Sequence, residues 1–439
     1  MTPSAIRKIF FDILSKTEKK VNEFVLKPGA DMTRHRRCSF SDTVLAVLNF
    51  TMERSSTELF NFFTRKKQHI PSKSAFTQQR KKLNDSLFPY LMACLNESVP
   101  LKKTYKGFHL IAIDGTDINL PTDRNDNIYR VKQARSDNFY YQMHLNALYD
   151  ILENRYVDAV IQPRPEMDEN AALQMLADRS EIPGKTIFIA DRGYVSSNSI
   201  AHLIESGNYF LIRSKAPSSP CSYIKHMMQD GVETDNVVDI GITGAKGICL
   251  KNPQVYKYLR PDRKFDFIAS SDRKSVYWMR VRCTCIKIGN NSYEYLISNL
   301  PKDEFSASDL KGLYWKRWAI ETSFRSLKYA FSMVYLHSVN RSLIKQEIFA
   351  KILLFNFTAL LHAYAQQSMQ LLRLVKSRKQ QYKVSFDNAV PIAKLFLIHM
   401  MSDNKIRNLL LSHLSAIRPV TKSGRKLRSQ TVRPLNTRA

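Results

Sequence analysis

The sequence predicts an α/β core that is interrupted by a β-rich insertion and flanked by helical regions. Two apolar runs, 108–113 and 186–190, have the unbroken hydrophobic pattern of central strands that are covered on both faces. Strand-like pieces separated by glycine and proline fill residues 216–305. Residues 1–105 and the region after 336 show the apolar periodicity of helices instead.

The chain is strongly basic, with 67 Lys and Arg residues against 39 Asp and Glu residues and a formal net charge of +28. Such an excess indicates a polyanionic partner, and nucleic acid is the usual one. A membrane surface is the alternative, but the longest apolar run, 348–361, contains Lys351 and Asn356 and is typical of a buried helix. The first residues lack the features of a signal peptide. We therefore expect a cytoplasmic, nucleoid-associated protein without membrane contact.

The 6 cysteines are scattered and form no Cys-x-x-Cys pair, so the sequence predicts no zinc site. Cys283 and Cys285 lie on the same side of a predicted strand, where we expect them to fill a core. The chain has no glycine-rich phosphate loop of the type that ends in Lys-Ser or Lys-Thr. We therefore expect no nucleotide cofactor.

Basic residues gather within the N-terminal region, between 61 and 82, where no acidic residue occurs. A predicted helix over 75–83 is expected to present Gln78, Gln79, Arg80 and Lys82 to solvent. Cations and helix N-termini bind phosphates, so this region is predicted to bind DNA. The alternative is a solvated basic surface without a site. A second basic segment, from 418 to the C-terminus, is also predicted to attract nucleic acid.

Each of the two predicted central strands ends in an aspartate that is soon followed by glycine. Asp114 precedes Gly115, and Asp191 stands two residues before Gly193. Such residues often serve only as turn formers, so neither aspartate is decisive alone. Asp117 competes with Asp114 for a functional role. We favour Asp114 because it terminates its strand directly, whereas Asp117 lies beyond the turn.

A third acidic residue belongs to a predicted helix over 314–328, with Ser308 and Asp309 as the expected N-terminal cap. On an ideal helix four polar residues share one stripe of about 60°, and these are Tyr314, Arg317, Glu321 and Lys328. A carboxylate between two cations suits a phosphodiester, because the carboxylate can hold a metal ion and the cations can hold phosphates. The alternative is a salt-bridged solvent face, in which Arg317 and Glu321 simply form an i,i+4 pair.

The spacing Y-(2)-R-(3)-E-(6)-K resembles the signature of bacterial insertion-sequence transposases of the DDE class, in the group numbered four. Residues 191–194, Asp-Arg-Gly-Tyr, are similar to that family around its second aspartate. The resemblance covers about residues 40–375 and implies a ribonuclease-H-like fold. It further implies that Asp114, Asp191 and Glu321 form a catalytic, metal-binding triad. Mg²⁺ is the implied cofactor, with Mn²⁺ as a substitute.

The resemblance also implies a function. The protein would bind the terminal inverted repeats of an insertion sequence, cleave at the element ends and join the 3′-hydroxyl to target DNA by two-metal phosphoryl transfer. Its partner would be double-stranded DNA, and we expect a homodimer when paired ends are bound. The alternatives are a metal-dependent nuclease that makes no strand transfer and a non-enzymatic repressor derived from a transposase.

The predicted DNA contacts come from the signature helix, from neighbouring strands and from the N-terminal cations. They are Tyr314, Arg317, Lys328, Arg192, Arg213, Trp318, Tyr295, Arg80, Lys81 and Lys82. Tyr295 and Trp318 are singled out as aromatic rings on which a displaced base could stack, with core packing as the alternative for each.

The predicted domain organisation has six parts. They are a helical basic DNA-binding region (1–105), the first part of the core (106–215), the β-rich insertion (216–305), the catalytic helix of the core (306–335), a C-terminal helical region (336–417) and a basic tail (418–439).

Overall fold

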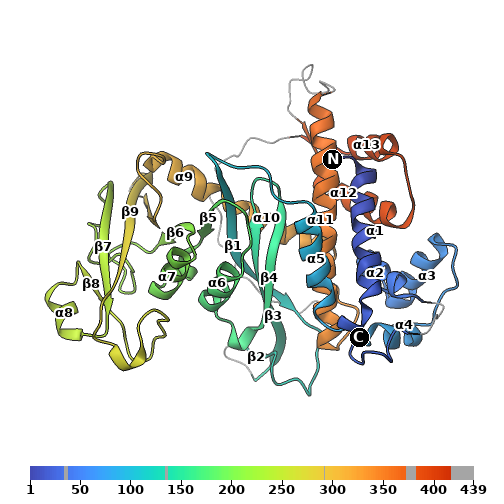
Figure 1. The fold of residues 1–439 in the computed structure, drawn as a ribbon, viewed down its shortest axis with the longest axis horizontal. Helices are drawn as coiled ribbons and strands as arrows, with labels where there is room; N and C mark the ends of the chain where they lie inside the picture. Colours follow the sequence, from blue (N-terminus) through green and yellow to red (C-terminus); the bar gives the residue numbers. More distant parts are fainter. Residues whose placement is uncertain (34–37, 134–136, 291, 372–381, 417–439) are drawn as a thin grey trace.

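The computed structural model describes residues 1–33, 38–133, 137–290, 292–371 and 382–416 (Figure 1). The predicted basic tail from 418 onward therefore lies outside the described residues. The molecule is elongated, with the strands of the insertion at one end, the core in the middle and a body of helices at the other end (Figure 1). This arrangement confirms the predicted α/β class with flanking helices.

A ten-stranded mixed sheet runs through both the core and the insertion, with neighbours in the order β2-β3-β1-β5-β6-β10-β9-β7-β8 and with β4 paired to β3. Its strands are β1 (Phe108–Asn119), β2 (Arg130–Lys132), β3 (Phe139–Asp150), β4 (Arg155–Pro163), β5 (Lys185–Ala190), β6 (Tyr209–Ser214), β7 (Thr234–Thr243), β8 (Tyr256–Tyr258), β9 (Tyr277–Gly289) and β10 (Ser292–Ser298).

The core of this sheet combines two kinds of pairing. β1, β3 and β4 form an antiparallel meander, whereas β5 lies parallel to both β1 and β6. The parallel pairing of β1 with β5 ends at Ala112 and Ile189, so Asp114, inside β1, and Asp191, directly after β5, each lie two residues beyond the last pair and can approach each other. This mixed order is consistent with a ribonuclease-H-like core.

The strands of the insertion continue the core sheet and do not form a separate one. β10 pairs antiparallel with β6, β9 pairs with β10, and β7 pairs with β9. Cys283 and Cys285 of β9 are buried in the apolar layer beneath this extension, which confirms their predicted place in a core.

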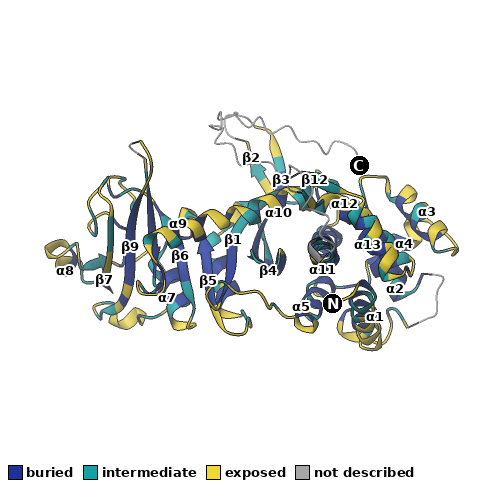
Figure 2. Cartoon of the chain, turned by 90° about the horizontal axis from the view of Figure 1, so that it is seen from above, coloured by how far each residue is buried: buried dark blue, intermediate teal, exposed yellow. Residues whose placement is uncertain are grey.

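Helices cover both faces of the core sheet. α6 (Glu169–Asp178) and α7 (Ser197–Glu205) pack on one face, over side chains such as Ile113 and Phe188. α9 (Ala307–Lys316) covers the opposite face near β5 and β6, and α10 (Trp318–Tyr329) contacts β1 (Figure 2). The short α8 (Lys246–Lys251) lies in the insertion.

The N-terminal and C-terminal helices form one body. Its members are α1 (Pro3–Lys19), α2 (Phe40–Asn49), α3 (Ser55–Arg65), α4 (Lys73–Arg80), α5 (Leu87–Ser98), α11 (Arg341–Leu371), α12 (Phe386–Ile398) and α13 (Asp403–Leu411), with the two-stranded pair β11 (Tyr382–Val384) and β12 (Leu414–Ala416). α11 is the central helix of this body and contacts α1, α2, α5, α12 and α13 (Figure 2).

The central helix α11 is long and apolar enough to cross a membrane by length and composition. However, 83% of its most apolar window is buried inside the protein. One apolar cluster joins its side chains to those of the surrounding helices. Its apolar character therefore follows from its position at the centre of a helical body, as the sequence predicts for 348–361.

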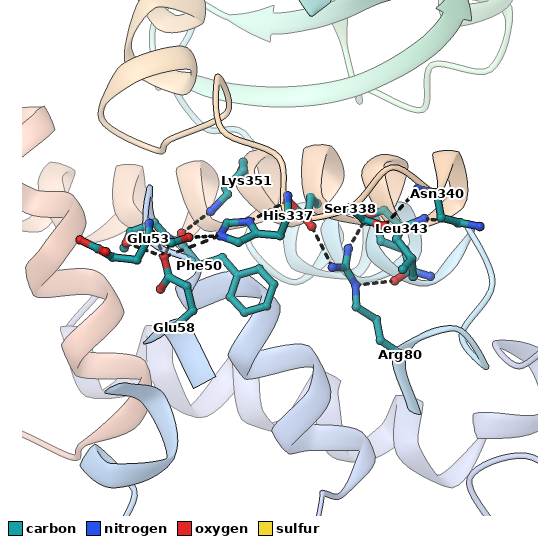
Figure 3. Close-up of polar contacts among 12 residues, drawn as sticks. Phe50, Glu53, Glu58, Arg80, His337, Ser338, Asn340, Leu343 and Lys351 are labelled. Atoms are coloured by element: carbon teal, nitrogen blue, oxygen red, sulfur yellow. Dashed lines mark hydrogen bonds and ion pairs between the residues drawn. The ribbon is translucent and has the colours of Figure 1, made fainter. Parts of the chain in front are cut away.

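A buried polar network joins the N-terminal helices to α11 (Figure 3). The Arg80 guanidinium donates to Glu347 Oε1 at 2.8 Å and to Gln346 Oε1 at 3.1 Å. Glu347 also accepts from the backbone N–H of His337 at 3.0 Å, and the ammonium groups of Lys351 and Lys394 both donate to the Phe50 carbonyl. These contacts replace hydration for charged groups that have almost no access to water.

The prediction that Arg80 faces solvent is wrong. Only 3% of Arg80 is exposed, because its guanidinium turns inward to Glu347. Gln79 is also wrongly predicted at solvent, since only 6% of it is exposed. Gln78 and Lys81 are exposed and Lys82 is half-buried. Arg80 connects two parts of the helical body and does not reach the surface.

Candidate active site between β1, β5 and α10

The polar stripe of the predicted helix is carried by two consecutive helices, α9 and α10, that meet at Arg317. The backbone N–H of Arg317 donates to the Tyr314 carbonyl at 3.1 Å, a tighter turn than the i to i−4 pattern of an α-helix. The N-terminal cap is Ser306, in a capping box with Asp309. The predicted cap at Ser308 is therefore wrong by two residues, whereas Asp309 does take part.

Two side chains of the stripe each contact one of the two aspartates, and one of them also contacts Glu321. The Tyr314 hydroxyl donates to Asp191 Oδ1 at 3.0 Å. The Arg317 guanidinium donates to Asp114 Oδ2 at 3.1 Å and to Glu321 Oε1 at 2.9 Å. The structure thus brings together Asp114, Asp191 and Glu321, which lie far apart in the sequence, around one buried arginine.

Asp117, the competitor of Asp114, belongs to a different group of side chains. One of its carboxylate oxygens lies 2.7 Å from His144 Nδ1 and 3.0 Å from Arg164 Nε. The structure therefore places Asp114, and not Asp117, on the guanidinium of Arg317. The prediction that Asp114 ends its strand and that Asp117 lies beyond a turn is wrong, because β1 continues to Asn119 and contains both residues.

Burial and neighbouring groups shift the pKa values of Asp114 and Asp191 in opposite directions. Burial raises the pKa of Asp114 to about 6 and outweighs the opposing effect of Arg317. Burial also acts on Asp191, but the Arg192 backbone N–H, Arg317 and the Tyr314 hydroxyl outweigh it, so the pKa of Asp191 lies below its usual value. Burial disfavours the Arg317 cation too, yet Tyr314 and the surrounding carboxylates hold its pKa above the usual value.

These opposite shifts predict a pH-dependent stability in the absence of metal. Because the folded-state pKa of Asp114 is raised, its contribution is present at low pH and is lost as the pH rises through about 6. The wild-type protein should therefore lose about 3 kcal/mol relative to Asp114→Asn as the pH rises from about 3 to about 7, with most of the loss between the ordinary aspartate pKa and about 6. Urea unfolding of both proteins at several pH values measures this difference. A constant difference across the range would contradict the assignment.

The three carboxylates fit a hard cation by their chemistry, since Mg²⁺ and Mn²⁺ prefer oxygen ligands. Within the described ranges, no group of three or more His, Cys, Asp or Glu side chains is close enough to hold a metal ion. The Arg317 guanidinium lies between Asp114 and Glu321 and supplies the positive charge that they share. Metal binding would therefore require Arg317 to release at least one of these carboxylates.

An open pocket lies beside the carboxylates and is lined by residues of β1 and α10. Its lining is Asp114, Gly115, Thr116, Glu321, Phe324, Arg325, Lys328 and Tyr329. Lys328, predicted to contact DNA, is thus placed beside the two acids. Burial lowers the pKa of Lys328, against the opposing effect of Asp117. Sequence reasoning missed Arg325 and Tyr329, although they follow Glu321 at four and eight residues and so share its helix face.

The other predicted DNA contacts differ in exposure. Arg192 is exposed directly after Asp191, and Arg213 of β6 is half-buried, with Nε 3.9 Å from Glu294 Oε1. Trp318 is 37% exposed at the start of α10, and its ring centroid lies 5.5 Å from Arg317 Cζ. All three are therefore close to the carboxylates or to residues that contact them.

The structure contradicts the predicted exposure of Tyr295 to a displaced base. The residue is only 6% exposed, its ring belongs to the apolar layer beneath the sheet, and its hydroxyl donates to Asp230. The hydroxyl also accepts from the Gly231 N–H at 3.0 Å. In this arrangement the ring packs in the core and is closed to a base. The exposed aromatic residues around α9 and α10 are Trp315, Trp318 and Tyr329.

Asp114 inside β1, Asp191 directly after the parallel strand β5, and Glu321 on the covering helix α10 form the arrangement that the resemblance to the DDE class predicts. Residues 106–357 match the family described as transposase DDE domain, which is more than half of the chain. The protein belongs to this family of DDE transposases. The resemblance to the DDE class is therefore confirmed, and membership of the group numbered four stays a prediction.

Comparison with solved structures gives distant likenesses. The piggyBac transposase synaptic complex with hairpin DNA has a TM-score of 0.45 and 13% sequence identity, over 98% of this chain and 88% of that chain. The Drosophila P element transposase strand transfer complex has a TM-score of 0.22 and 10% identity, over 92% of this chain and 97% of that chain. A search of curated proteins found no match.

Proposed function

We propose that this protein is a DNA transposase of an insertion sequence that cleaves at the element ends and joins the freed 3′-hydroxyl to target DNA. The observation that carries the proposal is the meeting of Asp114, Asp191 and Glu321 on Tyr314 and Arg317. Membership of the DDE transposase family supports it. The proposal includes a ribonuclease-H-like core, with which the order β4-β3-β1-β5-β6 agrees.

In this proposal the carboxylates hold divalent metal, Mg²⁺ or Mn²⁺, which supplies activation of the attacking oxygen and stabilisation of the leaving oxygen. The protein's own residues position the DNA. Arg317, once it releases a carboxylate, offers a planar pair of donors for a phosphate, and Lys328 offers a second charge in the adjoining pocket. The Tyr314 hydroxyl holds Asp191 in orientation through its hydrogen bond.

The proposed partner is double-stranded DNA, as element ends and as target. The net charge of +28 supports this choice, since phosphate contacts dominate affinity for DNA. Two ends must be cut and joined together, so we propose a homodimer on paired ends. The alternatives, a nuclease without joining and a repressor, differ from this proposal in their products.

Lys328→Ala should weaken binding of the element end and lower the cleavage rate, each by about 10–100-fold, because a charge-assisted phosphate contact is worth about 1.5–3 kcal/mol. Lys316→Ala is the matched control, since Lys316 is exposed on α9 and does not line the pocket. Fluorescence anisotropy with a labelled end duplex measures binding, and gel analysis measures cleavage. Equal behaviour of the two variants would remove Lys328 from the DNA site.

The exposed cations around α3 and α4 should contribute salt-sensitive affinity for DNA. They are Arg65, Lys67, Lys73 and Lys81. Replacing all four by Gln should reduce the slope of log K against log salt by up to about 0.9 for each lost phosphate contact. Deleting 418–439 should reduce the slope further. Binding titrations at several salt concentrations measure the slope, and an unchanged slope would show that these segments lie away from the DNA.

A further inference from the structure

We propose that His144 and Glu169 are positioning residues that together brace the two backbone segments carrying Asp114, in β1, and Asp191, directly after β5. The inference rests on the proposed function, because it assigns a role to these residues in aligning the carboxylates. Neither residue touches the carboxylates directly in the described contacts. Their effect would pass through the two glycines that follow the aspartates.

The first segment, within β1, leaves little space for a side chain at Gly115. A Cβ atom there would lie 2.2 Å from His144 Nε2 and 3.1 Å from Asn146 Oδ1. The backbone of Gly115 does not adopt the left-handed conformation, so close approach alone requires glycine. The imidazole of His144 therefore packs directly against Gly115, the residue that follows Asp114.

In the second segment, directly after Asp191, Glu169 occupies the space that a side chain at Gly193 would need. A Cβ atom at Gly193 would lie 2.6 Å from Glu169 Oε2. The neighbouring Asn170 donates from Nδ2 to the Gly193 carbonyl at 3.2 Å. The start of α6 thus lies close to the backbone just after Asp191, and a side chain at Gly193 would have to displace the Glu169 carboxylate.

His144 and Glu169 also approach each other and so link the two backbone segments. His144 Nε2 lies 3.6 Å from Glu169 Oε1, while Nδ1 is 2.7 Å from Asp117 Oδ1. His144 is 5% exposed, and its Nε2 has no hydrogen-bond partner among the described residues. A buried imidazole held between two carboxylates is well suited to a fixed position.

The brace acts from the face of the sheet opposite to α10. α6 packs on one face, and α10 contacts β1 from the other. Tyr314 and Arg317 would hold the carboxylates by their oxygens, while His144 and Glu169 would hold the backbone from which those carboxylates project. Groups that orient metal ligands in this indirect way typically change metal affinity by about 10–100-fold when they are removed.

Paired substitutions test the brace. Gly115→Ala and His144→Ala should each weaken Mn²⁺ binding by about 10–100-fold, measured as loss of the free-ion signal in electron paramagnetic resonance. The double variant should bind Mn²⁺ no more weakly than His144→Ala alone, because removal of the imidazole relieves the clash. Gly193→Ala with Glu169→Ala should behave alike. Gly247→Ala is the matched control, since a Cβ at Gly247 meets nothing within 4 Å.

Amide hydrogen exchange of peptides that cover 112–118 and 190–195 gives a readout that needs no metal. His144→Ala and Glu169→Ala should each speed exchange in both peptides, whereas Gly247→Ala should leave exchange in both unchanged. Losses that simply add in the double variants, or exchange that stays at the wild-type rate, would overturn the brace. Failure of the wild-type protein to bind Mn²⁺ would instead count against the proposed function, and hydrogen exchange would still judge the brace.

Discussion

Glu321→Ala, Asp114→Ala and Asp191→Ala should each lower DNA cleavage and joining by about 10³-fold or more while binding of the element end stays largely intact. The expectation follows from electrostatic catalysis, because each change removes a charged group from the place where the proposed chemistry occurs. A labelled end duplex with Mg²⁺ measures cleavage, and the same duplex with Ca²⁺ measures binding.

Glu304→Ala is the matched control for these variants, since Glu304 is an exposed carboxylate just before α9. Thermal unfolding checks that the variants are folded, and Asp114→Asn provides a version of the same size should Asp114→Ala be unstable. Wild-type cleavage by folded Glu321→Ala would show that the stripe on α9 and α10 is only a salt-bridged surface.

The second large effect concerns stability. Glu347→Ala should lower the free energy of unfolding by about 3–5 kcal/mol, because it leaves the buried Arg80 cation without its carboxylate partner. Burial alone would raise the pKa of Glu347, but Arg80 and His337 hold it at about 2, so the carboxylate is charged at neutral pH. Urea unfolding at pH 7 measures the loss.

The control for this prediction is an ion pair at the surface. Arg280→Ala breaks the exposed pair with Asp239, whose side chains are 75% and 55% exposed, and should cost no more than about 1 kcal/mol. An equal loss in Glu347→Ala and Arg280→Ala would mean that the network between the N-terminal helices and α11 contributes little to stability.

The parts of the site that follow from local pattern could be predicted from the sequence. The strands that carry Asp114 and Asp191 are visible because a strand covered on both faces needs consecutive apolar residues. The stripe that carries Glu321 is visible because helical periodicity survives the break at Arg317. The break itself could not be predicted, because no glycine or proline lies at Arg317.

Features that depend on long-range pairing could not be predicted. Arg80 reads as a surface cation within a basic stretch, yet its partner Glu347 lies 267 residues further along the chain. Tyr295 reads equally well as exposed or buried on an alternating strand, and only the pairing of β10 with β6 and β9 places its ring in the core. The same pairing makes the insertion a continuation of the core sheet.

The measurement that tests the central claim most directly is a strand-transfer assay with a pre-cleaved element end. A labelled duplex with a free 3′-hydroxyl is incubated with supercoiled plasmid, Mg²⁺ and the wild-type protein. The proposed function predicts joined products that carry the label, which vanish with a 3′-deoxy end and with Glu321→Ala. A wild-type protein that only cuts, or joining that persists in Glu321→Ala, would contradict it.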